Sequence, residues 1–186
     1  MKDLSIKEKY AKEVAPKLKE IFGYKNTLSA PKIEKIVVNI GLGRMSQNSN
    51  FAEKMLPEVI KDLGIITSQK PVTTLAKKSI AGFKIREGQT VGLKVTLRKA
   101  KMNDFLERLI KIILPRVRDF RGINLKNIDQ KGNLSIGFKE NIVFPEISAD
   151  NVKVDFGLET TIVIKAKSRK EAIEFYRLMG IPLKKS

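Results

Sequence analysis

Apolar residues in this chain follow two different periods, which alternate along the sequence. Residues 31–43, PKIEKIVVNIGLG, form a nearly continuous β-branched run that ends in glycines, which is typical of a buried strand. Residues 102–113 instead repeat apolar side chains at helical spacing ahead of Pro115, where this helix is expected to stop. Such alternation without a strict βαβ repeat predicts an α+β fold, with one mostly antiparallel sheet and helices packed on one of its faces. The other face is then open for a ligand.

Helical spacing marks both ends of the chain. It predicts an N-terminal helix over residues 4–22, where Pro16 is either tolerated or introduces a kink. It also predicts a C-terminal helix over residues 168–179, which Ser168 and Glu171 begin as a capping box. Because no linker or internal repeat separates these ends, all 186 residues are expected to form a single domain.

A second helix is expected between residues 50 and 64. Asn50 and Glu53 resemble a capping box, and Gly64 is suited to close the C-terminus. Pro57 is expected to shorten this helix, because proline lacks a backbone N–H. The other expected elements are a polar loop at 46–50, a short strand at 65–75, a long loop at 76–92, strands at 92–98, 134–138 and 158–166, and an irregular segment at 116–132.

The charge of the chain restricts its partners. It has 37 Lys and Arg residues against 20 Asp and Glu, a formal net charge of +17. Such an excess favours a polyanionic partner, either a nucleic acid or an anionic membrane surface. No apolar run approaches the roughly 18 residues of a membrane span. The charged start MKDLSIKEKY has no apolar signal region. We therefore expect a nucleic-acid partner and no membrane.

The chain contains neither histidine nor cysteine. This excludes a Ser-His-Asp triad, disulfides and cysteine-based zinc sites. The spacing of Asp150, Asp155 and Glu159 matches no Mg²⁺ loop. The glycines at 41–43 lack the spacing of a dinucleotide fingerprint or a Walker motif, and a turn that ends a strand is the better interpretation. We therefore expect no catalytic site, no metal and no cofactor.

Almost half of the excess charge lies in one window, residues 67–101, which has nine Lys and Arg residues and one acid, Glu87. Lysine and arginine neutralise phosphates, and Gly82 and Gly88 let the backbone approach a ligand. Small hydroxyls in the window suit contacts with phosphate or with the ribose 2′-OH. Phe83 has two interpretations of equal weight, because its ring is suited either to stack on a base or to pack in the core. The window as a whole predicts RNA binding.

A second cluster consists of Arg116, Arg118 and Arg121 around Asp119. Three arginines just beyond a helix are suited to bind phosphates or the carboxylates of a partner protein. Local ion pairing with Asp119 is an equally weighted alternative.

Three long stretches resemble the bacterial form of the large-subunit ribosomal protein that carries 5S rRNA, the L-five family. They are PKIEKIVVNIGLG at 31–43, QKPVTTLAKKSIAGFKIREG at 69–88 and KVTLRKAKMNDFLERLIKIILPRVRDFRG at 94–122. The stretch GNLSIGFKENIVFPEI at 132–147 resembles the next block of that family. The resemblance covers most of the chain. It implies a non-enzymatic ribosomal protein on cytoplasmic ribosomes, with an α+β fold whose open sheet face holds 5S rRNA.

The resemblance also implies partners and sites. The implied partners are 5S rRNA, large-subunit rRNA, P-site tRNA, neighbouring large-subunit proteins and a protein of the small-subunit head. The residues implied for the 5S rRNA face are Asn39, Gln69, Lys70, Thr73, Thr96 and Arg98. The residues implied for the loop that reaches P-site tRNA are Lys77, Lys78, Ser79, Gly82, Phe83 and Lys84. The region after Pro115, which carries Arg116, Arg118 and Arg121, is implied to form an inter-subunit bridge.

Three positions depart from the family pattern. Leu75 stands where the family often has arginine, which puts one RNA contact in doubt, and Ser68 replaces a common glycine, which puts the turn before Gln69 in doubt. Pro57 is unusual in the second helix.

Two other functions stay open beside the ribosomal one. A free-standing RNA-binding factor or chaperone shares the basic window, and an Mg²⁺-dependent nuclease is opposed by the dispersed acids.

Overall fold

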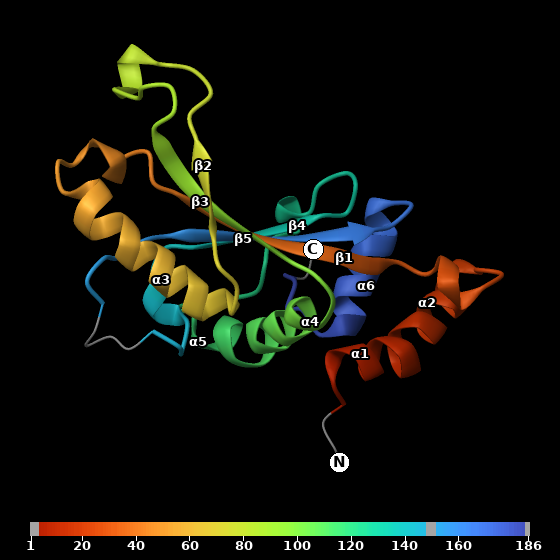
Figure 1. Cartoon of the computed structure of the whole chain (residues 1–186). Coiled ribbons are helices and arrows are strands. Elements are labelled where there is room, and N and C mark those ends of the chain that lie inside the picture. Colours follow the sequence, from red (N-terminus) through yellow and green to blue (C-terminus); the bar gives the residue numbers. More distant parts are fainter. Residues whose placement is uncertain (1–3, 148–151, 185–186) are drawn as a thin grey trace. The chain divides into compact units, whose positions relative to one another are not determined.

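The computed structural model describes residues 4–147 and 152–184 (Figure 1). The chain divides into two compact units, each built from separate stretches of sequence. The first unit comprises Met1–Ile36, Arg98–Ile136 and Thr161–Ser186, and the second comprises Val37–Leu97 and Gly137–Thr160.

The α-helices are α1 (Ile6–Lys9), α2 (Ala15–Phe22), α3 (Leu56–Thr67), α4 (Lys99–Arg108), α5 (Leu114–Arg116) and α6 (Arg169–Met179). Three π-helical segments are η1 (Tyr10–Val14), η4 (Phe51–Met55) and η6 (Leu109–Ile113). Short 3₁₀ turns are η2 (Thr27–Ser29), η3 (Met45–Gln47), η5 (Ala81–Phe83), η7 (Leu125–Asn127) and η8 (Asn141–Val143). The strands are β1 (Lys32–Gly41), β2 (Val72–Leu75), β3 (Thr90–Leu97), β4 (Leu134–Phe138) and β5 (Leu158–Lys165). All of these elements lie in the described part of the chain, where every helix is too short or too polar to cross a lipid bilayer.

The strands form one open antiparallel sheet in the order β2-β3-β1-β5-β4. Buried and more exposed residues alternate along β3, β4 and β5 and along the second half of β1. Because successive side chains of a strand point to opposite faces, the sheet buries one face and leaves the other open. The predicted α+β fold is confirmed, and strand β4 has the predicted bounds.

Each helical proline follows a π-helical segment. Pro16, Pro57 and Pro115 each stand near the start of an α-helix that continues directly from η1, η4 or η6. In each case the residue before the proline donates its N–H to the carbonyl five residues back, as Ala15 does to Tyr10. The wider π turn lets the helix pass a residue that has no N–H of its own. The helix predicted to stop at Pro115 ends one residue later, at Arg116.

The second helix differs from its prediction at both ends. The Asn50 side chain makes no capping hydrogen bond, so the predicted capping box is wrong. The helix does not close at Gly64 but continues to Thr67, and Ser68 adopts the left-handed conformation that ends it. Residues 65–67, predicted as the start of a strand, are therefore helical, and strand β2 begins only at Val72.

The C-terminal helix begins as its sequence predicts. The Ser168 side chain accepts a hydrogen bond from the Glu171 N–H at 3.3 Å. The Glu171 carboxylate accepts from the Lys167 N–H at 2.9 Å rather than from Ser168, so the second half of the capping box is shifted by one residue. Within the first unit, α1 packs beside α4, and η1 and α2 pack beside α6 (Figure 1).

Candidate nucleic-acid interface

Strand β3 presents a polar, cationic face in the second unit. Its residues Leu93 and Leu97 are buried, whereas Lys94 is exposed and Thr96 is half-buried. The alternation places Lys94 and Thr96 together on the open face of the strand. Thr96 was predicted there. Lys94 was not singled out from the basic window, although its position in an alternating strand carried the signal.

Asn39 lies on the open face of β1, the neighbour of β3 in the sheet, as Lys94 and Thr96 do on β3. It is exposed between Val38 and Ile40, which are fully buried. The two strands approach closely at Gly92, where a Cβ atom would lie only 2.6 Å from the Ile40 carbonyl oxygen. Glycine is required there because any side chain would force the strands apart. Because Asn39 alternates with the buried Val38 and Ile40, it lies on the open face of the sheet, as the polar residues of β3 do.

The turn after α3 brings Gln69 to this surface. Ser68 adopts a φ of 51°, so the serine forms the left-handed turn that glycine usually makes. The Thr67 hydroxyl lies 3.1 Å from the Gln69 carbonyl oxygen and helps to hold the turn. Gln69 Nε2 then donates to the Thr96 carbonyl at 3.2 Å, and Lys70 is exposed beside it in sequence. The substitution that put this turn in doubt is therefore compatible with it.

Thr73 projects to the other side of the sheet. In the antiparallel pairing of β2 with β3, Thr73 is opposite Leu93 and Val72 is opposite Lys94. Directly opposed residues project to the same face. Thr73 therefore shares a face with the buried Leu93, and Val72 shares the open face with Lys94. The structure does not bring Thr73 together with Thr96.

Arg98 lies in the first unit and has an acidic partner there. Its Nη1 atom lies 3.7 Å from Glu34 Oε1, and the two side chains are 53% and 55% exposed. An exposed pair of this kind contributes roughly 0–1 kcal/mol. Because the pair is weak, a phosphate group can replace Glu34 as the partner of the guanidinium at little cost.

The arm, which we define as residues 76–89, continues the β2–β3 hairpin beyond Leu75 (Figure 1). Ile80 and Ile85 exchange two backbone hydrogen bonds, at 2.9 and 3.2 Å. The Ser79 hydroxyl accepts from the Glu87 N–H at 2.9 Å. The segment predicted as a long loop is therefore a folded hairpin tip. Leu75, where the family often has arginine, is exposed at its base.

Cations and an aromatic ring are exposed on the arm. Lys77, Lys78 and Lys84 are exposed, and none of them forms an ion pair within residues 4–147 and 152–184. Phe83 is 65% exposed, so the interpretation that its ring packs in the core is wrong. A Cβ atom at Gly82 would meet nothing within 4 Å, which leaves the backbone there open to a ligand.

A hollow of about 370 Å³ opens beside the exposed ring. It is lined by Gly41, Gly43, Arg44, Gln47, Phe83 and Ile85. Gln47 Nε2 donates to the Phe83 carbonyl at 3.0 Å and braces the arm against this turn. Strand β1 ends at Gly41, as predicted for this glycine-containing turn. An aromatic ring, a guanidinium and uncovered backbone meet here, a combination suited to an unstacked base and its phosphate.

The arginine cluster follows α5 in the first unit. Arg116, Arg118 and Arg121 are all exposed. Asp119 forms no ion pair with any of them in the described part of the chain, so the alternative of local pairing is wrong. The three guanidinium groups are therefore available to an external anion.

The C-terminal segment, which carries the exposed Lys184, pairs with the chain just beyond this cluster. The Ile123 N–H donates to the Pro182 carbonyl at 2.8 Å, and the Lys184 N–H donates to the Ile123 carbonyl at 2.9 Å. Gly122 adopts a φ of 91°, and a Cβ atom there would lie 3.2 Å from the Lys184 nitrogen. This pairing holds Lys184 beside the chain that carries Arg121, which the sequence pattern did not indicate.

Acidic residues do not gather into a metal site in the described ranges. No three His, Cys, Asp or Glu side chains within 4–147 and 152–184 come close enough to hold an ion. Of the three acids considered from the sequence, Asp150 lies outside the described residues.

Two family models match nearly consecutive parts of the chain. Residues 26–86 match the model described as ribosomal protein L5, and residues 90–183 match the model described as the C-terminus of that ribosomal family. Similar proteins cover almost all of the chain. The large ribosomal subunit protein uL5 of Alkaliphilus metalliredigens is 50% identical over 180 residues, 97% of this chain and 98% of the relative. That of Desulforapulum autotrophicum is 52% identical over the same shares. That of Clostridium tetani is 50% identical over 95% of this chain and 96% of its own.

Proposed function

Because the chain belongs to the ribosomal L5 family, we propose that it anchors 5S rRNA in the central protuberance of the large ribosomal subunit. It is a non-enzymatic, structural constituent of that subunit on the cytoplasmic ribosome. The observation that carries the 5S rRNA assignment is the open face of β1 and β3 in the second unit. Asn39, Lys94 and Thr96 on this face offer an amide, an ammonium and a hydroxyl.

The chemistry of this face suits RNA. An asparagine or glutamine amide can hydrogen-bond a base edge or a 2′-OH, and an exposed lysine neutralises a phosphate. Gln69 Nε2 already donates a hydrogen bond to the Thr96 carbonyl, so the side-chain amide oxygen of Gln69 is pre-oriented. Pre-orientation lowers the entropy lost when the RNA binds. Thr73, which projects to the other face, is not part of this proposed contact.

The arm is proposed to contact P-site tRNA. It presents Lys77, Lys78 and Lys84 without acidic partners in the described residues, and it holds the exposed ring of Phe83 at its tip. Lysine side chains suit a phosphate backbone, which carries no sequence information. A contact of this type fits a partner such as tRNA, which changes in sequence from one decoding cycle to the next.

The arginine cluster is proposed to meet a protein of the small-subunit head and to form an inter-subunit bridge. Arg116, Arg118, Arg121 and Lys184 supply donors without a local carboxylate partner in the described residues. Arginine binds carboxylates in a bidentate manner, which makes it suited to a protein partner.

Sedimentation of large subunits tests the ribosomal assignment. The tagged protein is expected to co-sediment with large subunits in gradients at high magnesium and to stay bound through repeated washing. Recovery of the protein only at the top of the gradient, together with RNA binding in solution, would identify it as a free-standing RNA-binding factor instead.

A further inference from the structure

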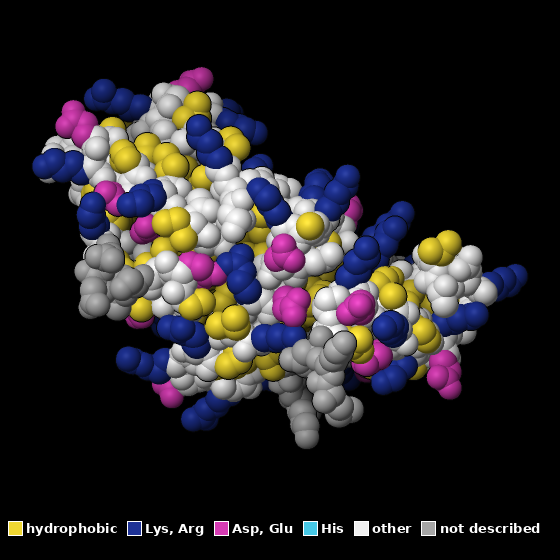
Figure 2. Space-filling view, turned by 60° about the horizontal axis from the view of Figure 1, so that its bottom comes forward, with side chains coloured by type: hydrophobic (Ala, Val, Ile, Leu, Met, Phe, Trp, Pro, Cys, Tyr) yellow, Lys and Arg dark blue, Asp and Glu magenta, His cyan; other side chains and the backbone are white. Residues whose placement is uncertain are grey.

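The first unit carries most of the excess charge of the protein. It contains 26 Lys and Arg residues against 11 Asp and Glu, a net charge of +15, whereas the second unit has 11 against nine, a net charge of +2. Figure 2 shows Lys and Arg side chains spread over the visible surface rather than gathered in one patch. The 5S rRNA face and the arm use cations of the second unit, apart from Arg98. The charge of the first unit therefore calls for a polyanion beyond the proposed contacts.

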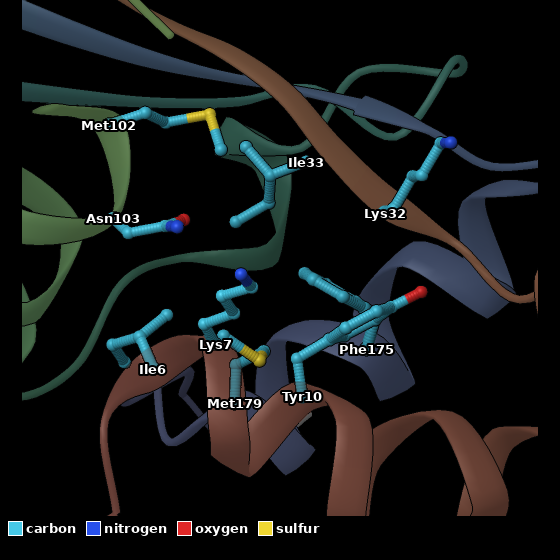
Figure 3. Close-up of a pocket in the computed structure, with 9 residues that line it drawn as sticks. All are labelled: Ile6, Lys7, Tyr10, Lys32, Ile33, Met102, Asn103, Phe175 and Met179. Carbon is cyan, nitrogen blue, oxygen red and sulfur yellow. The ribbon is translucent and has the colours of Figure 1, made fainter. Parts of the chain in front are cut away.

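A hollow of about 130 Å³ lies in the first unit, between segments that are far apart in sequence (Figure 3). Its walls come from α1, η1, β1, α4 and α6, and they are Ile6, Lys7, Tyr10, Lys32, Ile33, Met102, Asn103, Phe175 and Met179. Pockets for drug-sized ligands measure roughly 300–1,000 Å³. This hollow is therefore of a size for one planar ring system or one side chain.

The residues that line the hollow favour a planar ring system over an apolar side chain. The Tyr10 ring is half-buried and rests 6.2 Å from the Phe175 ring, which holds it in place at the wall of the hollow. The Asn103 side chain makes no hydrogen bond to the described protein residues. An apolar side chain would cover that amide without pairing it, whereas a base edge offers it both donors and acceptors.

Cations stand at the edge of the hollow. Lys7 and Lys32 are exposed, and neither forms an ion pair within the described ranges. In Figure 3 the Lys7 side chain extends into the space between Ile33 and Tyr10. The Lys7 ammonium is suited to neutralise a phosphate, the Tyr10 ring to stack on the face of a base, and the Asn103 amide to hydrogen-bond the edge of that base.

We propose that this hollow takes one unstacked nucleobase of RNA, which gives the first unit an RNA contact of its own. The base lies against Tyr10, its edge meets the amide of Asn103, and its phosphate is neutralised by Lys7. All of its residues belong to the first unit, whereas the arm and the residues of the 5S rRNA face other than Arg98 belong to the second.

Ultraviolet crosslinking in assembled large subunits tests this contact. Subunits that contain the full chain are irradiated, digested with nuclease and protease, and analysed by mass spectrometry for peptides that carry a nucleotide. We expect an adduct on Tyr10. Asn103→Leu and Lys7→Gln are each expected to reduce its yield about 2- to 10-fold, because the first removes a hydrogen bond to the base edge and the second a charge beside its phosphate. Lys17→Gln removes the same charge from an exposed position that does not line the hollow and is expected to leave the yield unchanged.

Two results would overturn the proposal. One is the absence of a nucleotide on Tyr10 while adducts form elsewhere on the same protein. The other is a lysine-specific crosslink that joins Lys7 or Lys32 to a neighbouring protein, which would identify a peptide as the occupant. Equal urea midpoints for the variants and the unmodified protein exclude unfolding as the cause of a lost adduct. Failure of the 5S rRNA or tRNA contacts would affect adducts in the second unit and leave the Tyr10 adduct in place.

Discussion

The open face and the arm are expected to contribute differently to the salt dependence of 5S rRNA binding. If about five cations neutralise phosphates of 5S rRNA, log K falls against log salt with a slope near −4, or about 250-fold over a fourfold rise in salt. Lys70→Gln with Lys94→Gln removes two exposed cations of the face, so the slope is expected to weaken to about −2.5 and the loss to about 30-fold.

The arm variant is the matched control for this change. Replacing Lys77, Lys78 and Lys84 by Gln removes three exposed cations, one more than the face variant. Because the arm is proposed to contact tRNA and not 5S rRNA, the slope for 5S rRNA is expected to stay within about 0.5 of the original. Fluorescence anisotropy of end-labelled 5S rRNA, from about 50 to about 200 mM KCl, measures all three slopes. A loss of two or more units in the arm variant, with the face variant unchanged, would refute this division of the basic window.

Three further changes test the packing, one turn and the arm. Gly92→Ala places a Cβ atom 2.6 Å from the Ile40 carbonyl oxygen, and urea unfolding is expected to show a loss of about 1–3 kcal/mol. Burial raises the pKa of the Asp129 carboxyl, but hydrogen bonds from Asn133 and from the backbone of Lys131 and Gly132 together outweigh it and hold that pKa below its ordinary value of 3.8. The stabilisation from ionised Asp129 is complete above pH 3.8 and is lost as pH falls through the lower pKa of the folded state, so the urea midpoints of the unmodified protein and of Asp129→Asn are expected to converge as the pH is lowered below 3.8. Phe83→Ala is expected to change stability by less than about 0.5 kcal/mol, because the ring is exposed, yet to weaken P-site tRNA retention on ribosomes by about 1–3 kcal/mol.

Local patterns predicted most of the elements because the periods of the strands and helices are clear. Strand β4 and the cap of α6 follow directly from alternation and from Ser168. Pro57 was expected to shorten its helix but does not, because a π turn, a backbone adjustment that side-chain spacing does not mark, lets the helix pass it. Gly64 did not end its helix, because it does not adopt the left-handed conformation of a helix C-terminus, which Ser68 adopts instead.

The sequence predicted that the basic window binds a polyanion, but it did not predict on which face of the sheet each residue of the window lies. The basic window indicated a polyanion, but the face on which a residue lies depends on strand register. Thr73 belongs to the same window as Lys94, yet the pairing of β2 with β3 sends the two side chains to opposite faces. The hollow around Tyr10 joins segments separated by up to about 170 residues in sequence, so no local motif could reveal it. Exposure of Phe83 likewise follows from the fold of the arm and not from its neighbours in sequence.

Directed cleavage of RNA tests whether the open face of β1 and β3 lies against 5S rRNA. Because the chain has no cysteine, a single cysteine can carry an iron chelate that cleaves nearby RNA with hydroxyl radicals. Asn39→Cys places the chelate on the open face, and Lys61→Cys places it at an exposed position of α3 in the same unit. This placement of the open face against 5S rRNA predicts strong, localised cleavage of 5S rRNA from position 39 and little from position 61. Cleavage from position 61 with none from position 39 would contradict it.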